Sequence, residues 1–214
     1  MQILPQPGHL GEAGGAGDDG GRGAGEGVPL SRVLGGGRRH HGLGRRALVA
    51  ARVPDGALEK AKEKGVNTCI DTAAGPFTRE EPWLGKFRRL MDVTDLLLLD
   101  LKHIDPAAHR ELTGADNANV LDCARFLSEI GKPVWIRHVL VPGITTDEAA
   151  LRRLGAFIRT LTNVKKVEVL PYHSLGVPKW KSLGLPYTFE NIMSPTAEQC
   201  ALAECILCCE RWCC

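Results

Sequence analysis

The chain has 214 residues, a formal net charge of +2 and 24% charged residues, so a polybasic nucleic-acid-binding arm is excluded as its main feature. It contains no run of about 18 apolar residues, and we therefore expect no membrane-spanning helix. A hydrophobic fraction of 43% is enough to build a core.

The first segment of the chain differs from the rest. Residues 1–57 hold 16 of the 25 glycines and seven arginines, but no lysine, aromatic residue or cysteine. Such a segment cannot build a core of its own. We predict three units: a Gly/Arg-rich segment at 1–57 that is disordered or read out of frame, an α/β unit at 58–193, and a C-terminal helix with a cysteine-rich end at 194–214.

Four short apolar runs that end in polar residues predict the buried strands of a parallel sheet. They are Val66–Thr72, Asp95–Lys102, Pro133–Val141 and Val167–His173. Amphipathic repeats predict the helices around them. These are Ala57–Lys64, Asn119–Ile130, Thr146–Leu161 and a last helix from about Ser194 to Trp212. The alternation of strands and helices predicts βαβ units with right-handed crossovers.

Two local patterns add to these predictions. Thr145 and Glu148 have the spacing of a capping box at the start of the third helix. Cys69 in a strand and Cys123 on a helix face are interpreted as small core residues.

Polar and ionisable residues gather where the predicted strands end. In β/α barrels, catalytic and binding residues lie at the C-terminal ends of the strands. The residues at the predicted strand ends are Asp71, Thr72, Asp100, Lys102, Arg137, His138, Tyr172 and His173. Together they predict one site for a charged small molecule. Alternatives remain open for single residues: a loop cap for either aspartate, a buried ion pair for Arg137, and a hydrogen-bonded core histidine for His173.

Several motifs in order along residues 58–212 resemble the pyruvate formate-lyase activating enzymes, a family of radical S-adenosylmethionine (SAM) enzymes. They are Cys69–Thr72, Asp95–Lys102, Trp135–Gly143, Leu170–Gly176, Lys179-Trp180 and Leu183-Gly184. The resemblance implies an α/β fold, namely a partial (β/α)6 TIM-like radical SAM barrel that here lacks its first strands.

The resemblance also implies the chemistry. A [4Fe-4S] cluster reduces SAM to a 5′-deoxyadenosyl radical, which removes hydrogen from a glycine of pyruvate formate-lyase or of a related glycyl radical enzyme. The cofactors supply the difficult chemistry and the protein orients them. The expected electron donor is a flavodoxin or ferredoxin, and the expected setting is anaerobic metabolism in the cytoplasm.

Site residues follow from the same resemblance. Those that resemble the family's SAM-binding residues are Asp71, Lys102, Arg137 and His173. Those that resemble its monovalent-cation site are Asp71, Thr72, Asp100 and the carbonyl of Leu98. The chain departs from the family in the loop Asp71-Thr72-Ala73-Ala74-Gly75, which is one residue longer than the family pattern.

A larger departure concerns the cluster itself. The family's Cys-x-x-x-Cys-x-x-Cys motif, whose thiolates bind three irons, and its Ser-Gly-Gly-Glu loop do not occur in this sequence. When Arg39–Ala57 is read one base later, permitted codons can encode the Ser-Gly-Gly-Glu segment. The hypothesis is therefore that residues 1–57 are an out-of-frame translation, with a natural leader as the alternative. As written, the chain is expected to lack the cluster and to be inactive alone.

Two further functions stay open. One is a half-barrel that binds a glycyl radical enzyme without activating it. The other is metal binding by the cysteine-rich end, where Cys205-x-x-Cys208 and Cys209-x-x-x-Cys213 have metal-ligand spacings. The cysteines of this segment are Cys200, Cys205, Cys208, Cys209, Cys213 and Cys214.

Overall fold

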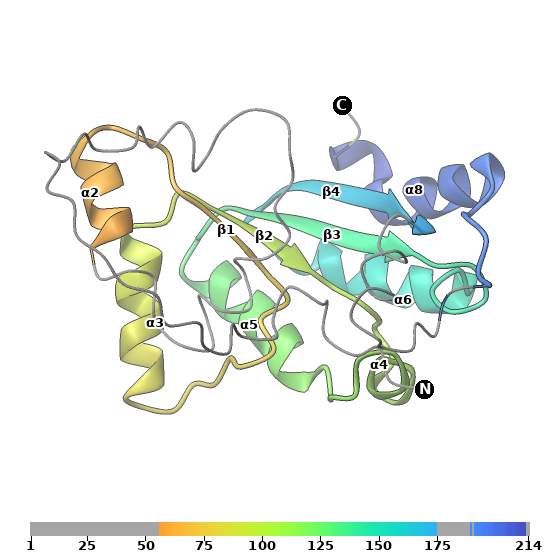
Figure 1. Ribbon diagram of the computed structural model, residues 1–214, viewed down its shortest axis with the longest axis horizontal. Helices are drawn as coiled ribbons and strands as arrows, with labels where there is room; N and C mark the ends of the chain where they lie inside the picture. The colour runs from red at the N-terminus through yellow and green to blue at the C-terminus, as the bar shows by residue number, and fades with distance from the viewer. Residues whose placement is uncertain (1–55, 175–188, 190, 213–214) are drawn as a thin grey trace, which may run out of the picture.

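The computed structural model of the chain describes residues 56–174, 189 and 191–212, with side chains up to residue 208 (Figure 1). Residues 1–55, with most of the Gly/Arg-rich segment, and residues 175–188, with the Lys179-Trp180 motif, lie outside the described residues. The elements are α2 (Ala57–Glu63), β1 (Cys69–Thr72), α3 (Trp83–Asp92), β2 (Leu96–Asp100), α4 (Pro106–Thr113), α5 (Ala118–Glu129), β3 (Val134–Leu140), α6 (Glu148–Arg159), β4 (Val164–Pro171) and α8 (Ala197–Trp212).

The four described strands form one parallel sheet in the order β1-β2-β3-β4, which confirms the predicted α/β class. Each predicted strand overlaps an observed one. The fourth begins earlier than predicted, because Val164 already pairs with Val134 across an irregularity in the β3–β4 register. In the ladder, Asp71 of β1 lies opposite Leu98, and Asp100 of β2 lies opposite Arg137.

Two helices were not predicted, α3 and α4. The α4 helix carries clear local signals, since the Asp105 side chain accepts hydrogen bonds from the first-turn amides and a left-handed Gly114 ends the helix. The predicted capping box is wrong. The α6 cap is Asp147, which accepts from the Ala150 amide at 2.8 Å. The Thr145 hydroxyl instead donates to the Val139 carbonyl and accepts from the Val141 amide.

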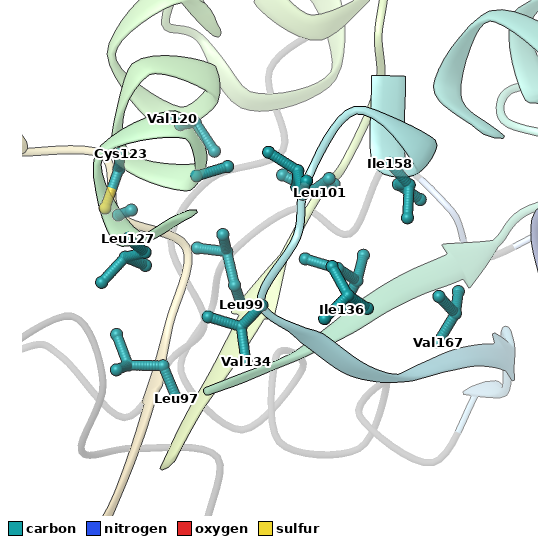
Figure 2. Close-up of a cluster of buried hydrophobic side chains, with 14 of the residues drawn as sticks. Leu97, Leu99, Leu101, Val120, Cys123, Leu127, Val134, Ile136, Ile158 and Val167 are labelled. Atoms are coloured by element: carbon teal, nitrogen blue, oxygen red, sulfur yellow. The ribbon is translucent and has the colours of Figure 1, made fainter. Parts of the chain in front are cut away.

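The helices gather over one face of the sheet, where alternate strand residues form the core (Figure 1). Figure 2 shows Leu97, Leu99 and Ile136 of the sheet pointing toward α5 and α6. Cys123 on α5 is fully buried, as predicted, but Cys69 is exposed on the other face of β1. None of the helices in the described part of the chain is long and apolar enough to span a membrane.

The loop after β1 is fixed at both ends. Its Ala74 is buried with a φ of 51°, a left-handed conformation that is uncommon for alanine, and its amide donates to the Thr72 hydroxyl at 2.9 Å. Farther along, the Arg79 guanidinium binds Asp122 and Glu129 of α5 at 3.0 and 2.8 Å. These contacts attach the loop that follows Asp71 to the helical layer.

If the buried side chains stabilise the fold, removing a buried leucine side chain should lower the free energy of unfolding far more than removing an exposed one. We expect Leu99→Ala, at 0% exposure, to lower the free energy of unfolding by about 2–5 kcal/mol. The matched control Leu202→Ala, at 43% exposure on α8, is expected to change it by about 0.5 kcal/mol or less. Urea denaturation measures both, and equal losses would contradict the assignment of the core.

Candidate functional site

Four charged side chains meet where β1 and β2 end, beside the middle of β3. Asp71 lies between the buried Ile70 and Thr72, so strand alternation turns its side chain to the face opposite the core. Asp100 and Arg137 lie on the same face of neighbouring strands and are register partners. Lys102 follows two residues after Asp100 and joins them.

Arg137 connects the group. Its side chain is only 8% exposed, and its Nε and Nη2 atoms lie 3.0 and 2.9 Å from Asp100 Oδ1. Its Nη2 also forms an ion pair with Asp71 Oδ1. Lys102 Nζ binds the other oxygen of Asp100 at 2.8 Å. Two carboxylates and two cations therefore form one continuous network.

The network keeps its buried members charged. Burial by itself raises the pKa of Asp100, but the neighbouring charges of Lys102 and Arg137 outweigh it and hold this pKa below the ordinary value. Burial likewise opposes the charge on Arg137, yet the carboxylates of Asp100 and Asp71 raise its pKa. Opposite charges held side by side suit a ligand that carries both charges itself.

Of the predicted cation ligands, Asp71, Asp100 and Leu98 lie on one face of the sheet, whereas the Thr72 side chain is buried. Leu98 is the register partner of Asp71 and precedes Asp100 by two residues on the same face. The Thr72 side chain is buried, and its hydroxyl accepts from the Ala74 amide. Its role as a cation ligand remains a prediction.

The strand-end residues predicted from β3 and β4 do not all join the network. His138 is buried on the core side of β3, and the Tyr172 hydroxyl donates to the Phe189 carbonyl at 3.0 Å. His173 is exposed, two residues beyond β4, and forms no ion pair or hydrogen bond with Asp71, Asp100, Lys102 or Arg137. Its role toward SAM stays a prediction.

Three further residues share the face of Arg137 and were missed from the sequence. Glu168 of β4 is the register partner of Arg137, and Lys166 Nζ binds it at 2.7 Å. The same ammonium lies 5.0 Å from the centre of the Trp135 ring. The alternation of charged and apolar residues in β4 was the available signal.

The cysteine-rich end is described only in part. Cys205 is exposed, whereas Cys208 is buried and its thiol lies 3.5 Å from the Val167 carbonyl of β4. Within the described residues, no group of three or more His, Cys, Asp or Glu side chains could hold a metal ion. Cys213 and Cys214 lie outside these residues, as does the Cys209 side chain, so metal binding by this end stays a prediction.

Known proteins are similar to this chain in fold and in sequence. A domain of a pyruvate-formate lyase-activating enzyme from Bacteroides vulgatus has the same fold, with a TM-score of 0.60 and 21% identity over 75% of this chain and 86% of that one. The described part of the chain is thus a partial radical SAM fold. No protein-family model matches the chain.

Curated protein sequences have a higher sequence identity to this chain than that structure has. The Streptococcus mutans pyruvate formate-lyase-activating enzyme is 51% identical over 139 residues, 65% of this chain and 53% of that enzyme. The Staphylococcus epidermidis enzyme is 52% identical over 141 residues, 66% of this chain and 56% of its own length. The C-terminal part of the chain is therefore homologous to pyruvate formate-lyase-activating enzymes. The chain spans a little over half the length of these relatives.

The charge network predicts a pH dependence. The pKa of Asp100 is lower in the folded chain than its ordinary 3.8, so its stabilisation is complete above that value and is lost as the pH falls through the lower folded pKa. At pH 7 we expect Asp100→Asn to cost about 1–3 kcal/mol of the free energy of unfolding. The difference between the two proteins should shrink below about pH 4. Urea denaturation from pH 7 to pH 3 measures it, and a constant difference would contradict the network.

Proposed function

We propose that the described part of the chain binds the methionyl end of SAM and forms the SAM-side portion of an activator of pyruvate formate-lyase or of a related glycyl radical enzyme. The observation that carries the proposal is the network in which Arg137 joins Asp71 to Asp100 and Lys102. Half of the aligned residues are identical to those of enzymes with that name, which supports the same reading.

The residues match the ligand by charge. The amino acid end of SAM carries an ammonium and a carboxylate, which need an anion and a cation placed close together. Asp71 is the proposed partner of the ammonium, and Lys102 and Arg137 are the proposed partners of the carboxylate. His173 completes the proposed set, as the resemblance implies.

A monovalent cation is part of the proposal. The oxygens of Asp71, Asp100, Thr72 and the Leu98 carbonyl are hard ligands, which suit such an ion. Asp71 and Asp100 come from neighbouring strands on one face, and Arg137 holds both of them. The two carboxylates on one face support the proposal, although both are already paired with Arg137, and the Thr72 hydroxyl is engaged by the Ala74 amide.

The iron–sulfur cluster does not fit the described residues. Among them no three-thiolate group exists, and residues 1–57 contain no cysteine. In this enzyme class the bound cluster supplies the electron that splits SAM into methionine and a 5′-deoxyadenosyl radical. The proposed activity therefore needs three thiolates that the described residues do not bring together, and an electron donor of the flavodoxin or ferredoxin type. The proposed setting is the cytoplasm.

The second candidate function is binding without activation. The lack of the three-cysteine motif in this sequence favours it over turnover by the chain alone. In that case the half-barrel docks on a glycyl radical enzyme and forms no 5′-deoxyadenosine. The two candidates differ in one product, which a single experiment measures.

A chimera tests the proposal directly. Residues 56–214 replace the matching part of the Streptococcus mutans relative, and the product is reconstituted with iron and sulfide under anaerobic conditions. We expect SAM-dependent 5′-deoxyadenosine and a glycyl radical EPR signal on pyruvate formate-lyase. A chimera that carries its cluster but forms no 5′-deoxyadenosine would contradict the proposed SAM site. 5′-Deoxyadenosine without the glycyl radical would contradict the assigned partner.

Two lysines provide a matched pair of variants in this chimera. Lys102 and Lys62 each pair with an aspartate, at 2.8 and 2.6 Å, but Lys62 binds Asp95 at the opposite end of the sheet. Lys102→Met is expected to weaken SAM binding about 10- to 100-fold, the value of a charge-assisted hydrogen bond. Lys62→Met should leave it unchanged. Equal effects would mean that Lys102 does not contact SAM.

A further inference from the structure

We propose that His138 is a positioning residue for Lys102, because it fixes the peptide bond through which the chain enters Lys102. The effect of His138 on SAM binding rests on the proposed function, in which Lys102 binds the SAM carboxylate. His138 itself lies on the core side of β3 and does not face the charge network. It acts through the backbone of the neighbouring strand.

The hydrogen bond between His138 and the Leu101 carbonyl is short, and its donor and acceptor are defined. His138 Nδ1 lies 2.8 Å from the carbonyl oxygen of Leu101, and His138 is only 2% exposed. A carbonyl can only accept a hydrogen bond, so Nδ1 carries the proton and donates it. On the other side, the Leu101 amide donates to the Arg137 carbonyl at 2.9 Å. Leu101 is therefore held at both of its backbone groups.

The position of Leu101 explains why this matters for the site. β2 ends at Asp100, and the Leu101 amide still bonds to β3, but Lys102 lies beyond the strand. The Leu101 carbonyl belongs to the planar peptide bond between Leu101 and Lys102. A hydrogen bond to that carbonyl sets the plane of the peptide and thus the direction in which Lys102 leaves the sheet. From there Lys102 Nζ reaches Asp100 at 2.8 Å.

The surroundings of the second ring nitrogen, Nε2, indicate what His138 contributes. Its Nε2 atom is buried and has no hydrogen-bond partner among the described residues, although the Thr145 backbone also faces the ring. Burial lowers the pKa of His138, so the ring stays neutral. An unpaired buried nitrogen is unfavourable compared with a carbon in the same place. The benefit of a histidine at this position is therefore the Nδ1 donor.

Two variants of nearly equal size isolate that donor. In His138→Asn the amide nitrogen takes the position of Nδ1 and still donates, whereas His138→Leu fills a similar volume with no donor. The first readout is the rate at which an amine-reactive acetylating reagent modifies each lysine of the full chain, resolved by mass spectrometry. Lys62, which is also ion-paired, serves as the internal control.

We expect His138→Leu to raise the acetylation rate of Lys102 at least threefold and to leave that of Lys62 unchanged. His138→Asn should react like the parent chain. The proposal is overturned if His138→Leu leaves Lys102 unchanged, if both lysines react faster together, or if the asparagine variant behaves like the leucine variant. This readout does not depend on SAM.

The second readout is SAM affinity of the full chain by isothermal titration calorimetry. His138→Leu should weaken binding severalfold in the parent chain, and it should add nothing in a Lys102→Met background, because the two residues act through one group. Additive losses would overturn the proposed route through Lys102. If the parent chain binds no SAM while the acetylation rates follow the expectation, the proposed function fails and the positioning role stands.

Discussion

The guanidinium of Arg137 holds together two carboxylates from two different strands, Asp71 at the end of β1 and Asp100 at the end of β2. A buried cation is tolerated only with such partners, and each carboxylate in turn needs the cation to remain ionised in its partly enclosed position. Lys102 extends this mutual dependence to the segment after β2. The site is therefore a balanced set of charges, in which the loss of one member leaves the others uncompensated.

The two faces of the sheet carry different kinds of side chain. One face carries alternate leucine, valine and isoleucine side chains against the helices (Figure 2). The other face carries the charged residues. This division follows from the alternation of side chains along parallel strands, together with the register that sets Asp100 beside Arg137. His138 links the two faces, because it belongs to the core layer yet holds the backbone next to Lys102.

Much of this arrangement could be predicted from the sequence. The apolar runs predicted all four described strands, and the polar residues at their ends included every member of the charge network. The helices α3 and α4 were not predicted, although α3 is amphipathic and α4 has Asp105 as its N-cap and Gly114 at its end. The contact of His138 with the Leu101 carbonyl and the position of Glu168 opposite Arg137 could not be predicted, because they depend on strand register, and register is a property of the paired sheet.

Asp71 and Asp100 belong to one charge network, which is proposed to bind the amino acid end of SAM. A titration of the full chain with SAM, followed by the ¹³C NMR signals of the assigned aspartate carboxylates, tests this directly. Asp71 and Asp100 should shift together with one dissociation constant, whereas Asp95, paired with Lys62 at the other end of the sheet, should not move. Unchanged Asp71 and Asp100 signals, or an equal shift of Asp95, would contradict the claim.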